Sequence, residues 1–99
     1  MPELDPNEID DVIHGRIRLS VMAFLSTAGE ADFGLLKEKT QTTDGNLSTH
    51  LRKLEDAGYI TQNKRFVGRR PQTLVAMTEV GREAFLKYLD ALGALLRPA

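Results

Sequence analysis

Residues 42–60 read TTDGNLSTHLRKLEDAGYI, and this stretch decides the fold because it specifies one amphipathic helix almost completely. At about 100° per residue, three leucines fall within a narrow arc and predict the buried stripe: Leu47, Leu51 and Leu54. Thr43 suits the N-cap, and Asp44 stands in the first turn, where the helix dipole favours a negative charge. Gly58 suits the C-terminal end. We expect a helix over residues 43–57.

The face opposite the leucines is polar and partly cationic. It carries Gly45, Asn46, Ser48, Thr49, Arg52, Lys53 and Asp56. Most polar helix faces are simply solvated, whereas short hydrogen-bonding groups beside two cations are also suited to contacting DNA. His50 lies beside the leucine stripe, so we favour packing or bridging to a turn over a base contact for this side chain.

Two apolar segments precede this helix. Asp5, Pro6 and Glu8 form a helix-start pattern, so we expect a helix beginning near residue 6. Its apolar side holds Ile9, Val12 and Ile13. Gly15 either kinks one long helix or separates two. The second run ends at Gly29 and holds Ile17, Val21, Phe24, Leu25 and Ala28.

A helix-turn-helix pattern follows. Asp32 suits the cap of a short helix over residues 33–39, which buries Phe33 and Leu36, and residues 40–43 supply the turn into the leucine-striped helix. Glu30 and Asp32 could also be read as a catalytic carboxylate pair. Capping explains Asp32 more simply.

The C-terminal part predicts a hairpin and a final helix. Residues 59–67 and 72–78 are rich in β-branched and aromatic residues and are joined by GRRP, which indicates a β-hairpin with a basic tip. Thr78 suits the cap of a helix over residues 79–96. Apolar residues recur there at helical spacing: Phe85, Tyr88, Leu89, Leu92, Leu95 and Leu96. Gly81 and Gly93 should weaken this helix by roughly 1 kcal/mol each.

Composition restricts the class of protein. Ninety-nine residues with 41% apolar content suit one domain over residues 1–99. Cysteine is absent, and the two histidines, His14 and His50, stand on separate elements, so we expect no metal and no cofactor. No Ser/His/Asp arrangement or phosphate-binding glycine loop appears, and we expect no catalytic residues and no enzyme. The acidic, polar N-terminus and the short apolar runs predict neither a membrane span nor a secretory signal, hence a cytoplasmic location.

Charge is distributed unevenly along the chain. The net charge is −1, but residues 1–11 hold five acids and no base, whereas residues 60–75 hold four bases and no acid. The local electrostatic field, rather than the net charge, decides which partner binds at a surface, so the basic hairpin can attract a polyanion although the whole chain is slightly acidic. For Arg16 and Arg18 we favour pairing with the acidic N-terminus over contacts to a nucleic-acid backbone.

These features together resemble a known family. The segments DGNLSTHLRKLEDAGYI and RRPQT, followed by T-E-x-G-R, are similar to those of small single-domain winged helix-turn-helix DNA-binding regulators related to the MarR and ArsR groups. The resemblance covers roughly residues 9–90. It implies a mainly α fold with a small β-hairpin (α+β): a three-helix core with the helix-turn-helix at about 32–57, a wing at about 59–78, and a dimerisation helix at about 79–96.

The resemblance also implies roles for individual residues. The recognition helix would enter the major groove of DNA and present Thr43, Asp44, Gly45, Asn46, Ser48, Thr49, Arg52 and Lys53. The wing would contact the minor groove and the backbone through Lys64, Arg65, Arg69, Arg70, Gln72 and Thr73. The last helix would pair two chains through Phe85, Tyr88, Leu89, Leu92 and Leu96.

The expected function is sequence-specific binding of double-stranded DNA by a transcriptional regulator. We expect a repressor that acts as a homodimer on a palindromic operator. The alternatives are a winged helix that binds another protein, for which the acidic N-terminus is the best support, and an architectural DNA-binding protein. A pure interaction module has no reason to gather four bases on the hairpin, which favours DNA. No effector ligand is indicated by the sequence.

Overall fold

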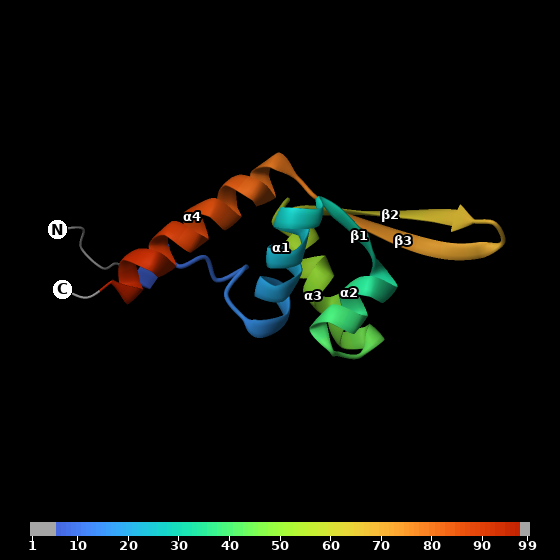
Figure 1. Ribbon diagram of the computed structural model, residues 1–99, viewed down its shortest axis with the longest axis horizontal. Coiled ribbons are helices and arrows are strands. Elements are labelled where there is room, and N and C mark those ends of the chain that lie inside the picture. Colours follow the sequence, from blue (N-terminus) through green and yellow to red (C-terminus); the bar gives the residue numbers. More distant parts are fainter. Residues whose placement is uncertain (1–5, 98–99) are drawn as a thin grey trace.

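The elements run along an elongated molecule of 56 × 25 × 21 Å, in which the β-hairpin and the last helix extend in opposite directions from the central helices (Figure 1). The structure, a computed structural model, describes residues 6–97. Its elements are the 3-10 turn η1 (Pro6–Glu8), α1 (Arg16–Ala28), β1 (Glu30–Asp32), α2 (Phe33–Thr40), α3 (Asp44–Asp56), β2 (Ile60–Val67), β3 (Arg70–Met77) and α4 (Glu79–Leu96). None of the helices in this described part of the chain is long and apolar enough to cross a membrane.

The core lies where α1, α2 and α3 meet the base of the sheet. The α3 leucine stripe is buried as predicted, and each of its three leucines is 0% exposed. The same cluster takes in Ile17, Val21, Met22 and Leu25 of α1, Leu36 of α2, Val75 of β3, and Phe85 and Tyr88 of α4. Buried apolar residues from every helix therefore fix the position of α3 relative to the hairpin.

Three predicted helix caps are confirmed. The Asp32 Oδ1 atom accepts a hydrogen bond from Leu35 N at 2.7 Å. Thr43 Oγ1 accepts from Asn46 N at 3.1 Å, and Thr78 Oγ1 accepts from Gly81 N at 2.9 Å. Each cap satisfies a backbone donor that the first turn of a helix leaves unpaired. The starts of α2, α3 and α4 are thus specified locally by the sequence.

The helix predicted to begin near residue 6 does start there, but its predicted continuation through Ile9, Val12 and Ile13 is wrong. Only a 3-10 turn forms at residues 6–8, and Asp5, its predicted cap, lies outside the described residues. Asp10 then organises a turn instead of a helix, because its Oδ1 atom accepts from Val12 N at 2.8 Å. Gly15 has φ 150°, a value that helical residues do not adopt, so it separates this turn from α1 rather than kinking one helix.

The N-terminal turn is fastened to the body by polar side chains. The Tyr59 hydroxyl donates a hydrogen bond to Asp10 Oδ2, and burial together with this carboxylate raises the pKa of Tyr59 to about 12. His14 Nδ1 and the Tyr88 hydroxyl are 3.0 Å apart. The N-terminal segment therefore packs between the start of the hairpin and α4 without forming an α-helix.

The sheet has one strand more than the sequence predicted. Its order is β1-β3-β2 with antiparallel pairing, and the short β1 pairs with β3 from Glu30↔Ala76 to Asp32↔Leu74. The hairpin itself is confirmed, although β3 begins at Arg70, so only Gly68 and Arg69 form the turn. Gly68 has φ 64°, the sign that the first turn position of a type II′ hairpin requires. Beyond its pairing with β1 the hairpin projects from the body, and we call the whole hairpin, residues 60–77, the wing.

Candidate nucleic-acid interface

The face of α3 opposite its leucines is open to solvent. All the predicted recognition residues are exposed: Thr43, Asp44, Gly45, Asn46, Ser48, Thr49, Arg52 and Lys53. Nothing lies within 4 Å of a Cβ built on Gly45, so the chain's own packing does not require glycine there. The helix therefore offers a low, polar surface at its N-terminal half.

Several of these side chains already have partners within the chain. The Thr43 hydroxyl caps α3, and Asn46 Nδ2 donates to Thr42 Oγ1 at 2.7 Å. Thr49 Oγ1 donates to Gly45 O at 3.0 Å, and Asp44 forms an ion pair of 2.9 Å with Lys37 of α2. An exposed pair of this kind contributes at most about 1 kcal/mol to stability. Its larger effect is to neutralise Asp44, which would otherwise repel a phosphate.

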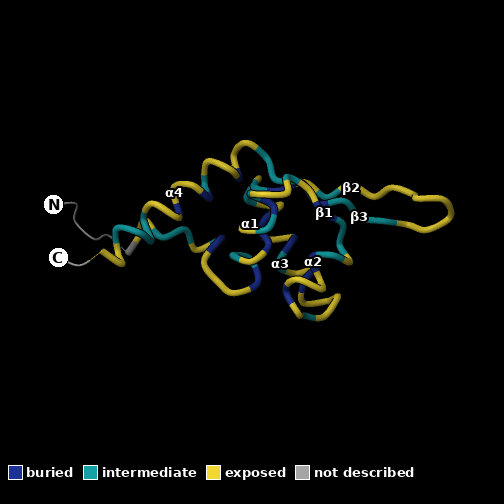
Figure 2. Tube along the Cα trace, in the orientation of Figure 1, coloured by how far each residue is buried: buried dark blue, intermediate teal, exposed yellow. Residues whose placement is uncertain are grey.

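The wing presents its cations on two faces. Strand residues alternate between faces, and cross-strand partners share one. The register pairs Lys64 with Thr73 on one face and Arg65 with Gln72 on the other. Arg69 stands in the turn. Residues 61 and 63–71 are all exposed, and Figure 2 shows the outer part of the wing as a solvated arm.

Two polar contacts hold the base of the wing in place. Glu55, near the end of α3, accepts from Gln62 N at 3.1 Å and from Gln62 Nε2 at 3.3 Å. β2 is an edge strand, so this carboxylate satisfies a backbone donor that the sheet leaves unpaired. The contact ties the orientation of β2 directly to the recognition helix.

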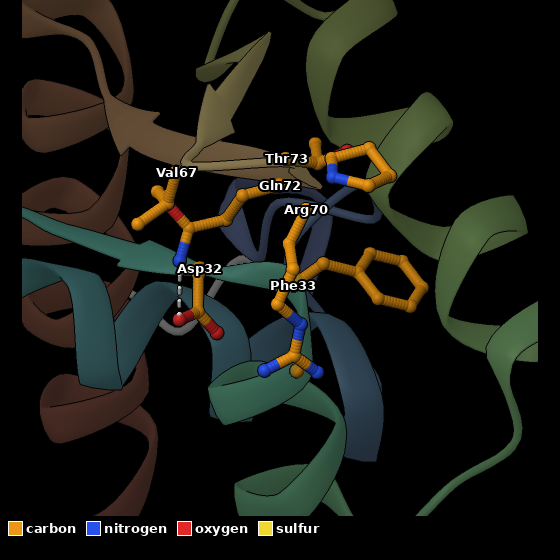
Figure 3. A pocket seen from close by; sticks show the side chains of 8 residues that line it. Asp32, Phe33, Val67, Arg70, Gln72 and Thr73 are labelled. Atoms are coloured by element: carbon orange, nitrogen blue, oxygen red, sulfur yellow. Dashed lines mark hydrogen bonds between the residues drawn. The ribbon is translucent and has the colours of Figure 1, made fainter.

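The second contact links the wing to the start of α2. Asp32 Oδ2 accepts from Gln72 Nε2 at 3.0 Å, and Gln72 Oε1 accepts from Arg65 Nε at 2.8 Å. Figure 3 shows the Asp32–Gln72 hydrogen bond at the edge of a hollow of about 430 Å³. The lining of this hollow comprises Asp32, Phe33, Gly34, Val67, Arg70, Pro71, Gln72 and Thr73. Gln72 therefore has both ends of its amide engaged inside the chain.

A cleft of about 390 Å³ joins the two predicted contact regions. Its walls are Phe33, Ser48, Arg52, Glu55, Gln62, Lys64 and Thr73. The structure thus brings Ser48 and Arg52 of α3 onto the same concave surface as Lys64 and Thr73 of the wing. Sequence reasoning did not single out Glu55 and Gln62 as part of this site, because nothing in a single sequence indicates that they meet.

His50 and Arg18 form a contact behind the exposed face. Arg18 Nη1 donates to His50 Nδ1 at 2.9 Å, so the histidine bridges to helix α1 rather than to a turn. Arg18 does contact the N-terminal segment, but through the carbonyl oxygens of Val12 at 2.5 Å and Asp11 at 3.3 Å. Partial burial, then the cations Arg18, Lys53 and Arg16, lower the pKa of His50 below its usual 6.5.

The predicted pairing residues of α4 divide into two groups. Phe85 and Tyr88 are 5% and 1% exposed, because they belong to the chain's own core and leave almost no surface for a second chain. Leu89 and Leu96 are 44% and 73% exposed, and Leu92 is half-buried. Of the predicted pairing residues, only those in the outer half of this helix leave apolar surface for a second chain.

Comparison with known proteins agrees with the geometry. A family model for the winged helix DNA-binding domain matches residues 17–96. An uncharacterized protein of Methanocaldococcus jannaschii, MJ0432, is 36% identical over 78 residues, which are 79% of this chain and 85% of that protein. A transcriptional regulator homologue from Pyrococcus horikoshii OT3 has a similar structure, with a TM-score of 0.76, 30% identity, and coverage of 91% of this chain and 94% of that one.

A third likeness concerns the fold alone. AbfR, a Staphylococcus epidermidis protein, was solved in its reduced form bound to DNA. It matches with a TM-score of 0.72 and 16% identity over 82% of this chain and 58% of that one. The family model, which matches residues 17–96, confirms the resemblance seen in the recognition segment and the wing, and the protein belongs to the family of winged helix DNA-binding domains.

Proposed function

We propose that this protein is a sequence-specific transcriptional regulator that binds a palindromic operator as a homodimer and represses by occupying the promoter. The cleft between α3 and the wing is the observation that carries the proposal. It joins a helix of short polar side chains to an arm whose cations have no acid among residues 60–75. The arrangement suits a duplex, because a major groove admits one helix while the neighbouring backbone meets the arm.

On α3 the proposed base contacts are Asn46, Ser48 and Thr49, because they are short, exposed and near the N-terminal end. Open space around Gly45 supports close approach of the helix to the base edges. Arg52 lies deeper and would reach a guanine or a phosphate, and Lys53 would neutralise a phosphate. Thr43 and Asp44 act mainly within the chain, as a cap and as a partner of Lys37.

On the wing the proposed phosphate and minor-groove contacts are Lys64, Arg69 and Arg70, with Thr73 as a weaker one. Gln72 and Arg65 change role in this proposal. Their hydrogen bonds to each other and to Asp32 make them residues that hold the wing at a fixed angle. The Nε atom of Arg65 donates to Gln72 and so helps to hold the wing, while the charge of its guanidinium stays near the DNA backbone.

The first experiment is selection of bound duplexes from a random-sequence pool at two salt concentrations. We expect an enriched palindrome with half-sites about 10 base pairs apart, since two recognition helices of a two-fold dimer lie about one DNA turn apart. Binding without enrichment would indicate an architectural protein. A lack of binding at moderate salt would instead favour a protein-interaction module.

Substitutions separate positioning on DNA from sequence reading. Arg69→Ala combined with Arg70→Ala should weaken binding to every duplex and reduce the salt slope by about two, because two phosphate contacts are lost. Asn46→Ala or Thr49→Ala should instead change which bases are preferred at one position, at a cost of about 1–3 kcal/mol for the favoured site. Titration of the same set of duplexes at several salt concentrations measures the affinity and the salt slope, and selection from the random pool measures the base preference. Identical behaviour of the two groups on every sequence would refute the assigned roles.

The homodimer is tested at Leu92. Leu92→Asp places a charge on the outer half of α4 and should give monomers in sedimentation velocity, because a buried unpaired charge is strongly unfavourable. Leu89→Asp repeats the test at a more exposed position, where misfolding is not a concern. Val80→Asp is the matched control, since Val80 is 57% exposed and, at about 100° per residue, lies on the side of α4 opposite Leu89. An unchanged species with both Leu89 and Leu92 substituted would defeat the proposal.

A further inference from the structure

The end of the wing carries apolar side chains that the chain leaves uncovered. Phe66 is 75% exposed and Val67 is 55% exposed, and both lie next to the turn that contains Arg69. An exposed phenylalanine at the end of a projecting arm adds nothing to the core, and burial of such a ring is worth more than that of most side chains. The position therefore calls for an external partner.

The register decides which way each residue faces. Phe66 pairs with Pro71, and two residues earlier Lys64 pairs with Thr73. Because faces alternate with a period of two, these four residues share one side of the hairpin. Lys64 and Thr73 line the cleft that Ser48 and Arg52 of α3 also line. Phe66 thus lies on the side of the wing that continues the recognition surface, whereas Val67 lies on the other side.

Charge identifies the partner. The cations Lys64, Arg65, Arg69 and Arg70 surround Phe66 in sequence, and no acid occurs among residues 60–75. Two wing tips of the same kind would repel each other, so contact with the tip of a second copy is unfavourable. A polyanion that also offers apolar surface fits both features, and the deoxyribose walls of the DNA minor groove supply apolar C–H groups between rows of phosphates.

We propose that Phe66, backed by Pro71, makes an apolar contact inside the minor groove beside the half-site and supplies binding energy that salt does not screen. Proteins that occupy this groove do place phenylalanine and proline against the duplex. The inference rests on the proposed DNA binding and adds a second kind of contact to it. The arginines of the wing release counterions, whereas the ring removes apolar surface from water.

The test is a salt series on one duplex carrying the selected palindrome. Phe66→Ala should weaken binding by about tenfold at every salt concentration and leave the slope of log K against log salt unchanged. Arg69→Ala with Arg70→Ala should lower that slope by about two. Val67→Ala, an exposed apolar residue on the opposite face, should change neither quantity. Phe66→Leu should keep most of the affinity, because it keeps an apolar group in the groove.

Hydroxyl-radical footprinting adds a structural readout. These radicals attack deoxyribose from the minor groove, so the wild-type protein should protect sugars flanking each half-site, and Phe66→Ala should lose that protection while the central protection remains. Affinity of Phe66→Ala equal to that of Val67→Ala, or a loss seen only as a changed slope, would overturn the inference. A wild-type protein that binds no duplex in the series would overturn the proposed function itself.

Discussion

The helices α3 and α4 both carry an apolar stripe, but the stripe of α3 is fully buried whereas that of α4 is partly exposed. All three leucines of the α3 stripe are 0% exposed, so this helix uses its apolar residues fully within the chain. In α4 the stripe begins in the core with Phe85 and continues beyond it, where Leu89 and Leu96 are 44% and 73% exposed. The surface left over on α3 is polar, and the surface left over on α4 is apolar.

Length relative to the core explains this difference. α3 has 13 residues and α4 has 18, so at 1.5 Å per residue α4 is longer by about 8 Å. Figure 2 shows the outer turns of α4, which are intermediate over residues 91–94 and exposed at Leu95 and Leu96, extending away from the central helices. Periodicity alone identifies both helices as amphipathic. Only the position of the remaining chain shows which stripe is buried within one molecule and which leaves apolar residues exposed.

Truncating a leucine on each stripe gives the largest contrast. Leu51→Ala should lower the free energy of unfolding by about 2–5 kcal/mol, because it leaves a cavity in a fully buried site. Leu96→Ala should cost less than about 0.5 kcal/mol, because that side chain is exposed. Urea denaturation of both variants at low protein concentration, where association is minimal, measures the two values. A large loss for Leu96→Ala under those conditions would contradict the comparison.

Two glycines of α4 provide a contrast within one helix. A Cβ on Gly81 would lie 2.0 Å from the carbonyl oxygen of Tyr59, whereas one on Gly93 would meet nothing within 4 Å. Gly81→Ala should therefore destabilise the protein by about 1–3 kcal/mol through overpacking. Gly93→Ala should stabilise it by up to about 1 kcal/mol, which is the difference in helix propensity.

The geometry around Gly81 corrects one sequence-based expectation, and thermal and urea unfolding of the two variants would test that correction. Both glycines were expected to weaken α4 equally, but Gly81 lies where the start of the helix crosses close to the hairpin, and there a glycine is needed. Equal effects of the two substitutions would show that the approach of α4 to Tyr59 is looser than the structure indicates.

Local signals account for what the sequence predicted well. The caps at Asp32, Thr43 and Thr78 act over three residues, and the α3 stripe repeats within one helix, so each can be recognised without knowing the rest of the fold. The false helix near residue 6 also came from a local pattern. There the Asp10 side chain and the backbone of Gly15 favoured a turn, which the apolar spacing of the segment did not reveal.

Long-range contacts account for what the sequence did not predict. The strand β1 has three residues and only one buried side chain, Ala31, so it exists because β3 lies beside it. The hydrogen bond between Gln72 and Asp32 joins residues 40 positions apart. Gln72 could be seen from the sequence to lie on a basic hairpin, which suggested a DNA contact. Its partner, and hence its role in holding the wing, depends on the fold.

The smallest expected effect is a change in the pH dependence of stability, and it comes from His50, which lies beside the leucine stripe of α3. Partial burial, and after it the cations Arg18, Lys53 and Arg16, hold the pKa of His50 below 6.5 in the folded state, so the unfolded chain binds the proton first as the pH falls. The stability that neutral His50 contributes is complete above pH 6.5 and declines as the pH falls from there toward its folded pKa. Protonation would also remove the acceptor at Nδ1 that Arg18 uses.

The variant His50→Gln keeps a hydrogen-bond acceptor for Arg18 and removes the titration. We expect the free energy of unfolding of the wild type, minus that of the variant, to decrease between about pH 7 and pH 5, because only the wild type has this proton uptake on unfolding. Urea denaturation at several pH values measures the difference, and His14, present in both chains, cancels. If the free energies of unfolding of the two proteins changed in parallel with pH, the folded structure would not favour neutral His50. Neither burial nor Arg18 would then act on this histidine as the structure indicates.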